Sequence, residues 1–233
     1  MAALASQRQG QEAFKICIMG DPMSGKSELT SALMNNTNSA LRSDVLRDIA
    51  YISGTDRSTG KNYFIQFWDT AGTIRHNRFD MGIMLRDSVG VFVMFDLTNR
   101  LSYENVDVWV AEIHSRFRPS PTRPGVLLPF IYLVGCKLDR ADGHDERQVY
   151  WDEIDAKATA NGWGCAQISA IEPCHNLQEL LEYVISELLR DKISRELPTD
   201  PHTTSPRITP HLLSSVFSSN SSEHRRNPFA SGC

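Results

Sequence analysis

The residue types best suited to chemistry lie in the loop GDPMSGKS, which runs from Gly20 to Ser27. This loop has the GxxxxGK[ST] pattern of a phosphate-binding loop, and it stands between an apolar run and a helical pattern. In such loops the backbone N–H groups and the helix N-terminus surround phosphate oxygens, the lysine neutralises them and the last hydroxyl ligates Mg²⁺. The pattern therefore predicts a nucleotide-phosphate site in which Lys26 carries the charge and Ser27 binds the metal ion.

A second candidate for metal chemistry is Asp69, which ends the apolar and aromatic run YFIQFWD. A carboxylate at the end of a parallel strand can reach an Mg²⁺ ion held by Ser27, usually through a water molecule. The turn-like sequence that follows includes Gly72, whose N–H could meet a terminal phosphate. We therefore expect Ser27 and Asp69 to be the metal-binding residues.

Short apolar runs and helical patterns must position these residues. Strands are predicted at 14–20, 63–69, 90–98, 127–135 and 164–170, with a further candidate at 50–54. Helices are predicted at 27–35, 103–117, 149–162 and 177–190. Continuous apolar strands that alternate with helices indicate a parallel sheet covered on both faces. We expect a single α/β domain with a mostly parallel six-stranded sheet and five main helices.

The composition narrows the class of protein. The chain has 233 residues and a formal net charge of −4, with 41% hydrophobic and 22% charged residues, as in an ordinary soluble globular protein. The sequence lacks the clusters of Lys and Arg that phosphate neutralisation requires, so we expect no nucleic-acid partner. No apolar run approaches the roughly 18 residues that span a bilayer, and the start of the chain lacks the apolar core of a secretory signal. Five cysteines without CxxC spacing favour free thiols in a reducing cytoplasm.

The composition also divides the chain. Residues 1–13 are expected to be a flexible arm and 14–193 the folded domain. Residues 194–233 are rich in Ser, Pro and Thr and are expected to be a disordered tail.

The order of the motifs GDPMSGKS, WDTAG, VFVMFDLTN, LVGCKLD and ISA is similar to that of the Ras superfamily of small GTPases. The sequence resembles the Rab branch most, through FIQFWDTAG, MFDLTNRLSYENVDVWVAEI and the Ser-rich tail that ends in cysteine. The resemblance covers roughly residues 14–192. It implies the P-loop GTPase fold, binding of GTP and GDP with Mg²⁺, and a role as a switch in vesicle trafficking, at the cytosolic face of an endomembrane. Effectors, exchange factors and GTPase-activating proteins would then bind through segments 36–56 and 72–88.

The resemblance also assigns residue roles. Asp139 would accept hydrogen bonds from guanine, Lys137 would lay its aliphatic stem over the base, and the Ala170 N–H would meet the guanine oxygen. The full nucleotide-binding set is Asp21, Pro22, Met23, Ser24, Gly25, Lys26, Ser27, Glu28, Gly72, Cys136, Lys137, Asp139, Ser169, Ala170 and Ile171. No catalytic residue is assigned.

Several positions depart from the family pattern. Thr73 stands where the family has a water-orienting glutamine, and because phosphoryl transfer depends on positioning and electrostatics, we expect slow intrinsic hydrolysis. Cys136 replaces an asparagine that, in the family, ties the base-reading segment (GCKLD, residues 135–139) to the phosphate loop. Weaker nucleotide affinity and faster nucleotide exchange are therefore expected. Pro22 offers no N–H. The first switch has no clear Thr-x-Gly, and the sequence does not decide which residue, if any, replaces the expected threonine; Thr37 and Ser43 are the two candidates.

These departures leave two functions open. One is a GTP/GDP switch with slow hydrolysis. The alternative is a hydrolysis-deficient, GTPase-like scaffold, for example a subunit of an intraflagellar-transport-type complex, that acts as a protein-binding module. Geranylgeranylation of Cys233 is a hypothesis: the ending ASGC does not match the four-residue prenylation box, and one lipid chain alone gives only marginal membrane binding.

Overall fold

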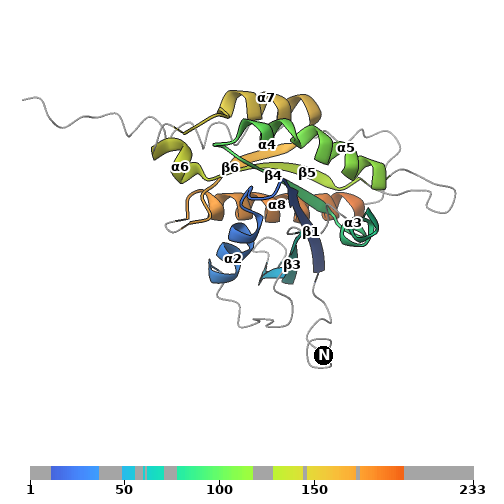
Figure 1. Ribbon diagram of the computed structural model, residues 1–233. Coiled ribbons are helices and arrows are strands. Elements are labelled where there is room, and N and C mark those ends of the chain that lie inside the picture. Colours follow the sequence, from blue (N-terminus) through green and yellow to red (C-terminus); the bar gives the residue numbers. More distant parts are fainter. Residues whose placement is uncertain are drawn as a thin grey trace, which may run out of the picture.

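A central β-sheet organises the computed structural model, which describes residues 12–36, 49–55, 60, 62–70, 78–117, 128–143, 146–171 and 174–196 (Figure 1). Within these residues the sheet has six strands in the order β2-β3-β1-β4-β5-β6. The strands are β1 (Glu12–Gly20), β2 (Ile49–Thr55), β3 (Asn62–Asp69), β4 (Gly90–Asp96), β5 (Phe130–Cys136) and β6 (Gly164–Gln167). All neighbouring pairs are parallel except β2 and β3, so the predicted mostly parallel six-stranded sheet is confirmed.

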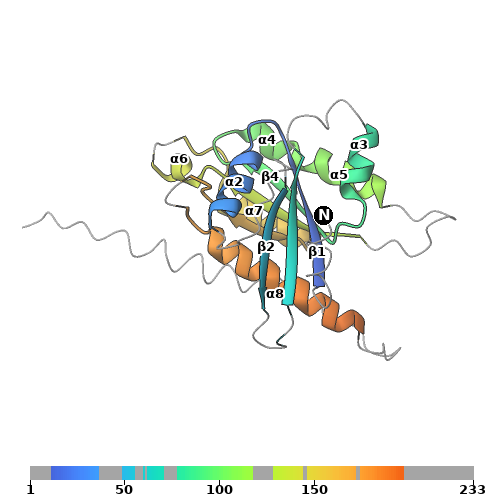
Figure 2. The same ribbon diagram turned by 90° about the horizontal axis from the view of Figure 1, so that it is seen from below.

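The register of the sheet brings the candidate residues together at one edge. β1 lies between β3 and β4, with Ile18 opposite Asp69 and Gly20 opposite Met94. The carboxyl ends of parallel neighbours meet at the same edge, so the phosphate loop after β1 begins beside the acid that ends β3. Figure 2 shows β2, β3 and β1 side by side, with α8 crossing beneath them.

Helices cover both faces of the sheet. The helices of the described residues are α2 (Lys26–Asn36), α3 (Arg78–Leu85), α4 (Arg100–Glu104), α5 (Val106–Arg116), α6 (Leu138–Gly143), α7 (Trp151–Asn161) and α8 (Leu177–Glu196). In one core, α2 and α8 pack on the sheet through residues such as Leu33 and Leu180. In the other core, α3, α5 and α7 pack on the opposite face through residues such as Leu85, Val110 and Ile154. Figure 1 shows the two layers, with α7, α4 and α5 above the sheet and α2 and α8 below it.

Some predicted boundaries differ from the structure. The helix predicted at 103–117 is two helices, because α4 ends and α5 begins at Asn105, whose N–H bonds to Leu101 O and Tyr103 O. The strand predicted at 90–98 stops at Asp96, where Thr98 N–H donates to the aspartate side chain at 2.8 Å and closes a turn. The strand predicted at 164–170 ends at Gln167.

The ends of the folded unit reach slightly past the predicted ones. β1 begins at Glu12 and α8 continues to Glu196. The rest of the predicted arm and tail lies outside the described residues. Among the helices that the structure describes, none has the length and apolarity needed to cross a membrane.

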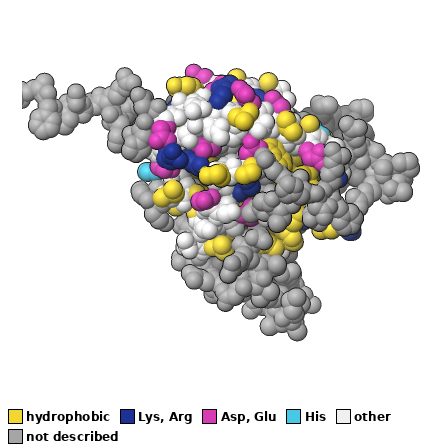
Figure 3. All heavy atoms as spheres, in the orientation of Figure 1, with side chains coloured by type: hydrophobic (Ala, Val, Ile, Leu, Met, Phe, Trp, Pro, Cys, Tyr) yellow, Lys and Arg dark blue, Asp and Glu magenta, His cyan; other side chains and the backbone are white. Residues whose placement is uncertain are grey.

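The layer of α4 and α7 carries mixed charges on its outer surface. Figure 3 shows acidic and basic side chains interspersed over this part of the molecule. Ion pairs between elements of this layer include Arg100 with Glu153 and Lys157 with Asp107. Exposed pairs of this kind contribute little to stability and make the surface polar.

Candidate functional site

The phosphate loop is held in a conformation that requires glycine at two positions. Gly20 has a φ of +143°, and a Cβ there would lie 2.1 Å from Met94 O, so β1 and β4 approach each other closely only because no side chain intervenes. Gly25 has a φ of +97°, and a Cβ there would lie 3.2 Å from Cys136 Cβ. Met23 has a φ of +63° and is exposed at the tip of the loop. The two glycines therefore allow a loop conformation that a side chain at either position would obstruct.

The side chain of Lys26 folds back onto the start of this loop. This side chain is buried, and Nζ donates hydrogen bonds to Gly20 O at 3.1 Å and Asp21 O at 2.6 Å. The ammonium thus lies beside the first two residues of the loop, where the sequence predicts a phosphate. The position is also at the beginning of α2, whose N-terminal N–H groups favour an anion.

Ser27 and Asp69 meet at the adjoining strand end. Ser27 Oγ donates a 2.8 Å hydrogen bond to Asp69 Oδ2, and the carboxylate is buried. The strand end is fixed by Thr70, whose N–H and Oγ1–H both donate to Ile18 O on β1, at 3.3 and 2.6 Å. The two residues predicted to bind the metal are therefore brought into contact.

The chemistry of this pair fits a hard cation. A hydroxyl and a carboxylate are oxygen ligands of the type that Mg²⁺ takes, and Mg²⁺ usually keeps several waters or phosphate oxygens besides one or two protein ligands. Among the described residues there is no group of three or more His, Cys, Asp or Glu side chains that could hold a metal ion. Ser27 and Asp69 would thus hold the ion together with a bound phosphate.

The predicted base-reading residues come from two neighbouring loops. Asp139 follows β5 and Ser169 follows β6, and Ser169 Oγ donates to Asp139 Oδ1 at 2.7 Å. The two loops are joined by backbone hydrogen bonds from Leu138 N–H to Ile168 O and from Ile168 N–H to Gly135 O. Ser169 is fully buried, so its hydroxyl holds the carboxylate in one orientation.

Lys137 adopts a left-handed backbone conformation with a φ of +63°. Its Nζ lies 2.7 Å from Asp96 Oδ2 at the end of β4, and both side chains are mostly shielded from solvent. Burial by itself raises the pKa of Asp96, but hydrogen bonds from Lys137 and Thr98 outweigh it and hold that pKa below its ordinary value. This ion pair fixes the lysine stem beside the base-reading loops.

Cys136 lies between the base-reading segment and the phosphate loop. Its side chain is buried, and its thiol donates a long hydrogen bond, 3.8 Å, to Val134 O within its own strand. Burial raises the pKa of this thiol well above its usual range, so the side chain is neutral. Within the described residues the thiol makes no hydrogen bond to the phosphate loop, which it only contacts by packing near Gly25.

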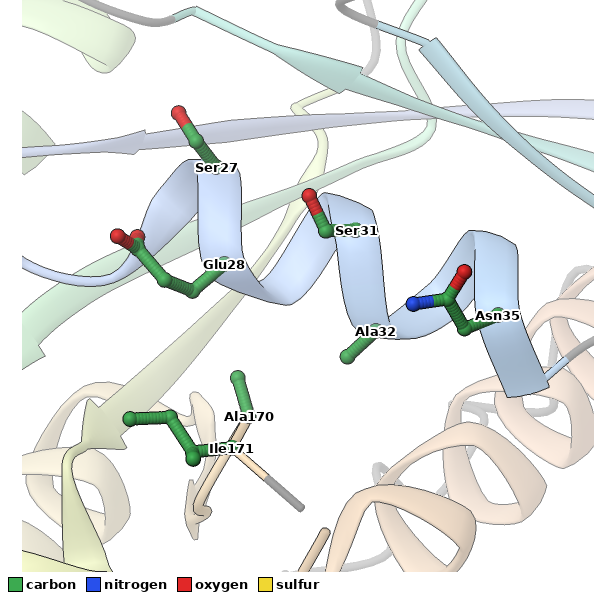
Figure 4. A pocket seen from close by; sticks show the side chains of 7 residues that line it. All are labelled: Ser27, Glu28, Ser31, Ala32, Asn35, Ala170 and Ile171. Atoms are coloured by element: carbon green, nitrogen blue, oxygen red, sulfur yellow. The ribbon is translucent and has the colours of Figure 1, made fainter.

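An open pocket of about 260 Å³ adjoins these loops (Figure 4). It is lined by Ser27, Glu28, Ser31, Ala32 and Asn35 of α2 and by Ala170 and Ile171 of the loop that faces it. Figure 4 shows Ala32 and Ala170 facing each other across the opening. Ser31, Ala32 and Asn35 were not predicted from the sequence, although Ser31 and Ala32 each lie four residues after Ser27 and Glu28, and Asn35 lies four residues after Ser31, on the same helix.

Asp21 connects the phosphate loop to a distant part of the chain. Its backbone is part of the loop, but its carboxylate accepts hydrogen bonds from Asn105 Nδ2 at 2.7 Å and Trp109 Nε1 at 2.9 Å, at the start of α5. Asn105, Trp109 and Asp96 were not among the residues predicted from the sequence. The first two lie 84 and 88 positions from Asp21, and no local pattern connects residues so far apart.

Other predicted residues lie outside the described part of the chain. These are Gly72, Thr73 and Cys233, with most of segment 36–56 before β2 and the first residues of segment 72–88. Their proposed roles stay predictions from the sequence.

Comparison with known proteins adds the family relationship. A family model described as the Ras family matches residues 15–190, which include the phosphate loop, Asp69 and both base-reading loops. The chain is also 28% identical, over 229 residues, to Ras-related protein RABA5e of Arabidopsis thaliana. That alignment covers 97% of this chain and 98% of the relative.

Proposed function

Because the chain belongs to the Ras family and is a Rab-like small GTPase, we propose that it binds GTP and GDP with Mg²⁺ and acts as a switch in vesicle trafficking. The observation that carries the proposal is the meeting of Lys26, Ser27 and Asp69 at one strand edge, beside the Asp139–Ser169 pair. A phosphate site and a base site on adjoining loops match the two ends of a nucleoside phosphate.

The phosphate end is supported by charge and backbone geometry. Lys26 provides a buried ammonium beside Gly20 O and Asp21 O, and the loop has glycine at the two positions, 20 and 25, where its backbone has a positive φ. Ser27 and Asp69 would hold Mg²⁺, which neutralises phosphate charge and orients the terminal phosphate when it is bound. Of these three residues, Lys26 is therefore the one whose loss should weaken nucleotide binding most.

The base end is supported by the orientation of Asp139. A carboxylate accepts hydrogen bonds but does not donate them, so it matches the N–H groups on the pairing edge of guanine and not the acceptor nitrogen of adenine. The hydrogen bond from Ser169 fixes this carboxylate before a ligand arrives. Selectivity for guanine over adenine follows from the same contact.

The rate of hydrolysis is proposed to be slow. Thr73 stands in place of the water-orienting glutamine, and a short β-branched side chain cannot make the same contact. A GTPase-activating protein would then supply the missing groups. The chain would act in the cytoplasm, at the cytosolic face of an endomembrane, and a lipid on Cys233 would add a weak anchor there.

A second candidate function is a protein-binding module that holds nucleotide without cycling. The observation that favours it is Cys136, whose thiol leaves the hydrogen bond between the base-reading segment and the phosphate loop unmade. Such a module would use the GTPase fold as a scaffold for assembly.

The test is to identify the nucleotide that co-purifies with the protein and to follow its turnover. We expect GDP, a GTP turnover that is measurable but slow, and a melting temperature that rises with added GDP and Mg²⁺ but not with ADP. Bound GTP without turnover would instead support the module, and an empty pocket with no response to either nucleotide would overturn both proposals.

A matched pair of variants connects the result to the site. Lys26→Ala should abolish the response to GDP, because it removes the buried ammonium of the loop. Lys157→Ala removes an ammonium from an exposed ion pair with Asp107 and should leave the response unchanged.

A further inference from the structure

The carboxylate of Asp21 is held by two side chains from another part of the chain. Asn105 Nδ2 donates to Oδ2 at 2.7 Å, and Trp109 Nε1 donates to Oδ1 at 2.9 Å. Asn105 and Trp109 are one helical turn apart, and Trp109 N–H bonds to Asn105 O, so the two donors lie on one face of α5. We call Asp21, Asn105 and Trp109 the Asp21 clamp.

The clamp acts on the residue that also holds the phosphate-loop lysine. Lys26 Nζ donates to Asp21 O at 2.6 Å, and Ser24 N–H donates to the same carbonyl at 3.3 Å. The side chain of Asp21 is thus fixed to α5 while its carbonyl orients Lys26. A displacement of Asn105 or Trp109 should therefore move the first turn of the phosphate loop and its ammonium together.

The same corner of the fold also holds the base-reading segment. Asp96 pairs with Lys137 at 2.7 Å, and Asp96 N–H donates to Ser102 Oγ on α4 at 2.9 Å. Ser102 Oγ in turn donates to Asn99 O at 2.7 Å. Residues 96–109, which we call the α4 corner, therefore contact the phosphate loop through Asn105 and Trp109 and the base-reading segment through Asp96.

Contacts with the rest of the fold hold the α4 corner in place. Asn99 caps α4 by accepting from Leu101 N–H at 3.1 Å, and Tyr103 is buried with its hydroxyl donating to Glu153 O at 2.8 Å. Val106 is fully buried in the core between the sheet and the helices. In Figure 1 α4 and α5 follow each other along the upper layer, next to the end of β4.

We propose that the Asp21 clamp positions the phosphate loop, and that the α4 corner sets this loop relative to the base-reading segment. Asn105 and Trp109 are positioning residues, because they act through Asp21 and Lys26. This inference deepens the proposed nucleotide binding and rests on it. The clamp lowers the freedom of the empty loop, so a nucleotide finds its phosphate contacts already arranged and leaves more slowly.

The decisive variants exchange the two partners of one hydrogen bond. Asn105→Asp replaces the donor amide with a second carboxylate, so the hydrogen bond to Asp21 is lost and the two charges repel each other. Hydrogen bonds to charged groups are among the strong ones, so release of a fluorescent GDP analogue should become about tenfold faster. The double variant Asn105→Asp with Asp21→Asn restores an amide–carboxylate pair of reversed polarity and should bring release back to within about threefold of the wild type. His114→Ala changes an exposed residue of α5 that lies outside the α4 corner and should have no effect.

Trp109→Phe tests the second donor with little change in packing, because it removes the indole N–H and keeps an aromatic ring. Release of the GDP analogue should be about fivefold faster. The indole N–H resonance of Trp109 should also shift in Asn105→Asp and move back in the double variant. If Asn105→Asp only weakened the helix, the melting temperature of the protein would fall, and the Trp109 resonance would not move back in the double variant.

Hydrogen exchange of the ligand-free protein separates the clamp from nucleotide binding. Amides of residues 23–27 should exchange faster in Asn105→Asp, and at the wild-type rate in the double variant and in His114→Ala. If the wild type binds no guanine nucleotide, the proposed function fails and this exchange pattern still decides the clamp. Wild-type exchange in Asn105→Asp, or a double variant that recovers nothing, overturns the clamp.

Discussion

Cys136 packs directly against Gly25 of the phosphate loop, where a Cβ on the glycine would lie 3.2 Å from Cys136 Cβ and 3.5 Å from its sulfur. The base-reading segment and the phosphate loop therefore touch through a buried thiol whose hydrogen bond goes to Val134 O, away from the loop. A thiol is a weak donor, and 3.8 Å is long even for sulfur. The two segments are therefore in van der Waals contact here, without a hydrogen bond between them.

An amide at this position should tie the two segments together. In Cys136→Asn the side chain can donate to the carbonyls of the phosphate loop, and one buried hydrogen bond contributes about 1 kcal/mol. We expect the GDP analogue to dissociate about fivefold more slowly than from the wild type. Cys136→Ser is the matched control, because a hydroxyl of nearly the same size is too short to make that bond. Equal dissociation rates for a well-folded Cys136→Asn variant and the wild type would contradict the argument.

The close approach of β1 and β4 makes Gly20 the least replaceable glycine of the loop. In Gly20→Ala the new Cβ meets backbone atoms of Met94 at 2.1 Å, and backbone in the centre of a sheet cannot move aside. We expect a loss of about 3 kcal/mol or more in the free energy of unfolding, measured with urea, together with loss of nucleotide binding.

Gly162→Ala is the control for this prediction. Gly162 also has a positive φ, +69°, but no atom lies within 4 Å of its added Cβ. Only the left-handed conformation is penalised there, at a cost of about 1 kcal/mol. If both variants lose the same stability, steric contact with Met94 is not what requires glycine at position 20.

The sheet and the phosphate loop were predictable from the sequence, whereas the α4 corner was not. Apolar strands and the GxxxxGKS pattern are local signals, and parallel pairing follows from the helices between the strands. The division at Asn105 was hidden because buried residues continue at helical spacing from Tyr103 through Val106 and Val110. The hydrogen bonds of Asp21 connect positions far apart in the chain, so only the fold brings their donors together.

The Asp96–Lys137 ion pair should make stability depend on pH in the acid range. The folded-state pKa of Asp96 lies below its ordinary value, so its contribution is fully present above about pH 4, the usual range of an unfolded aspartate. It is lost as the pH falls through the lower folded-state pKa. Asp96→Asn removes this contribution at every pH.

The measurement compares urea unfolding of the wild type and Asp96→Asn between pH 7 and pH 3. The stability difference between them should be largest near neutral pH and should shrink as the pH falls below 4. Asp107→Asn removes one member of an exposed ion pair with Lys157 and should show only a small difference across the range. A difference for Asp96→Asn that stays constant down to pH 3 would exclude the ion pair as its cause.

The last prediction concerns Thr73, which follows Gly72 in the sequence. A glutamine there can reach a water molecule next to the terminal phosphate, and a positioning contact worth about 1.4 kcal/mol in the transition state corresponds to a tenfold rate. We expect Thr73→Gln to raise the single-turnover rate of GTP hydrolysis about tenfold while GDP affinity stays the same. Thr73→Asn is the matched control, since its amide is one methylene shorter and should give little or no increase. Comparable single-turnover rates for the wild type and Thr73→Gln would refute the proposal that this position makes hydrolysis slow.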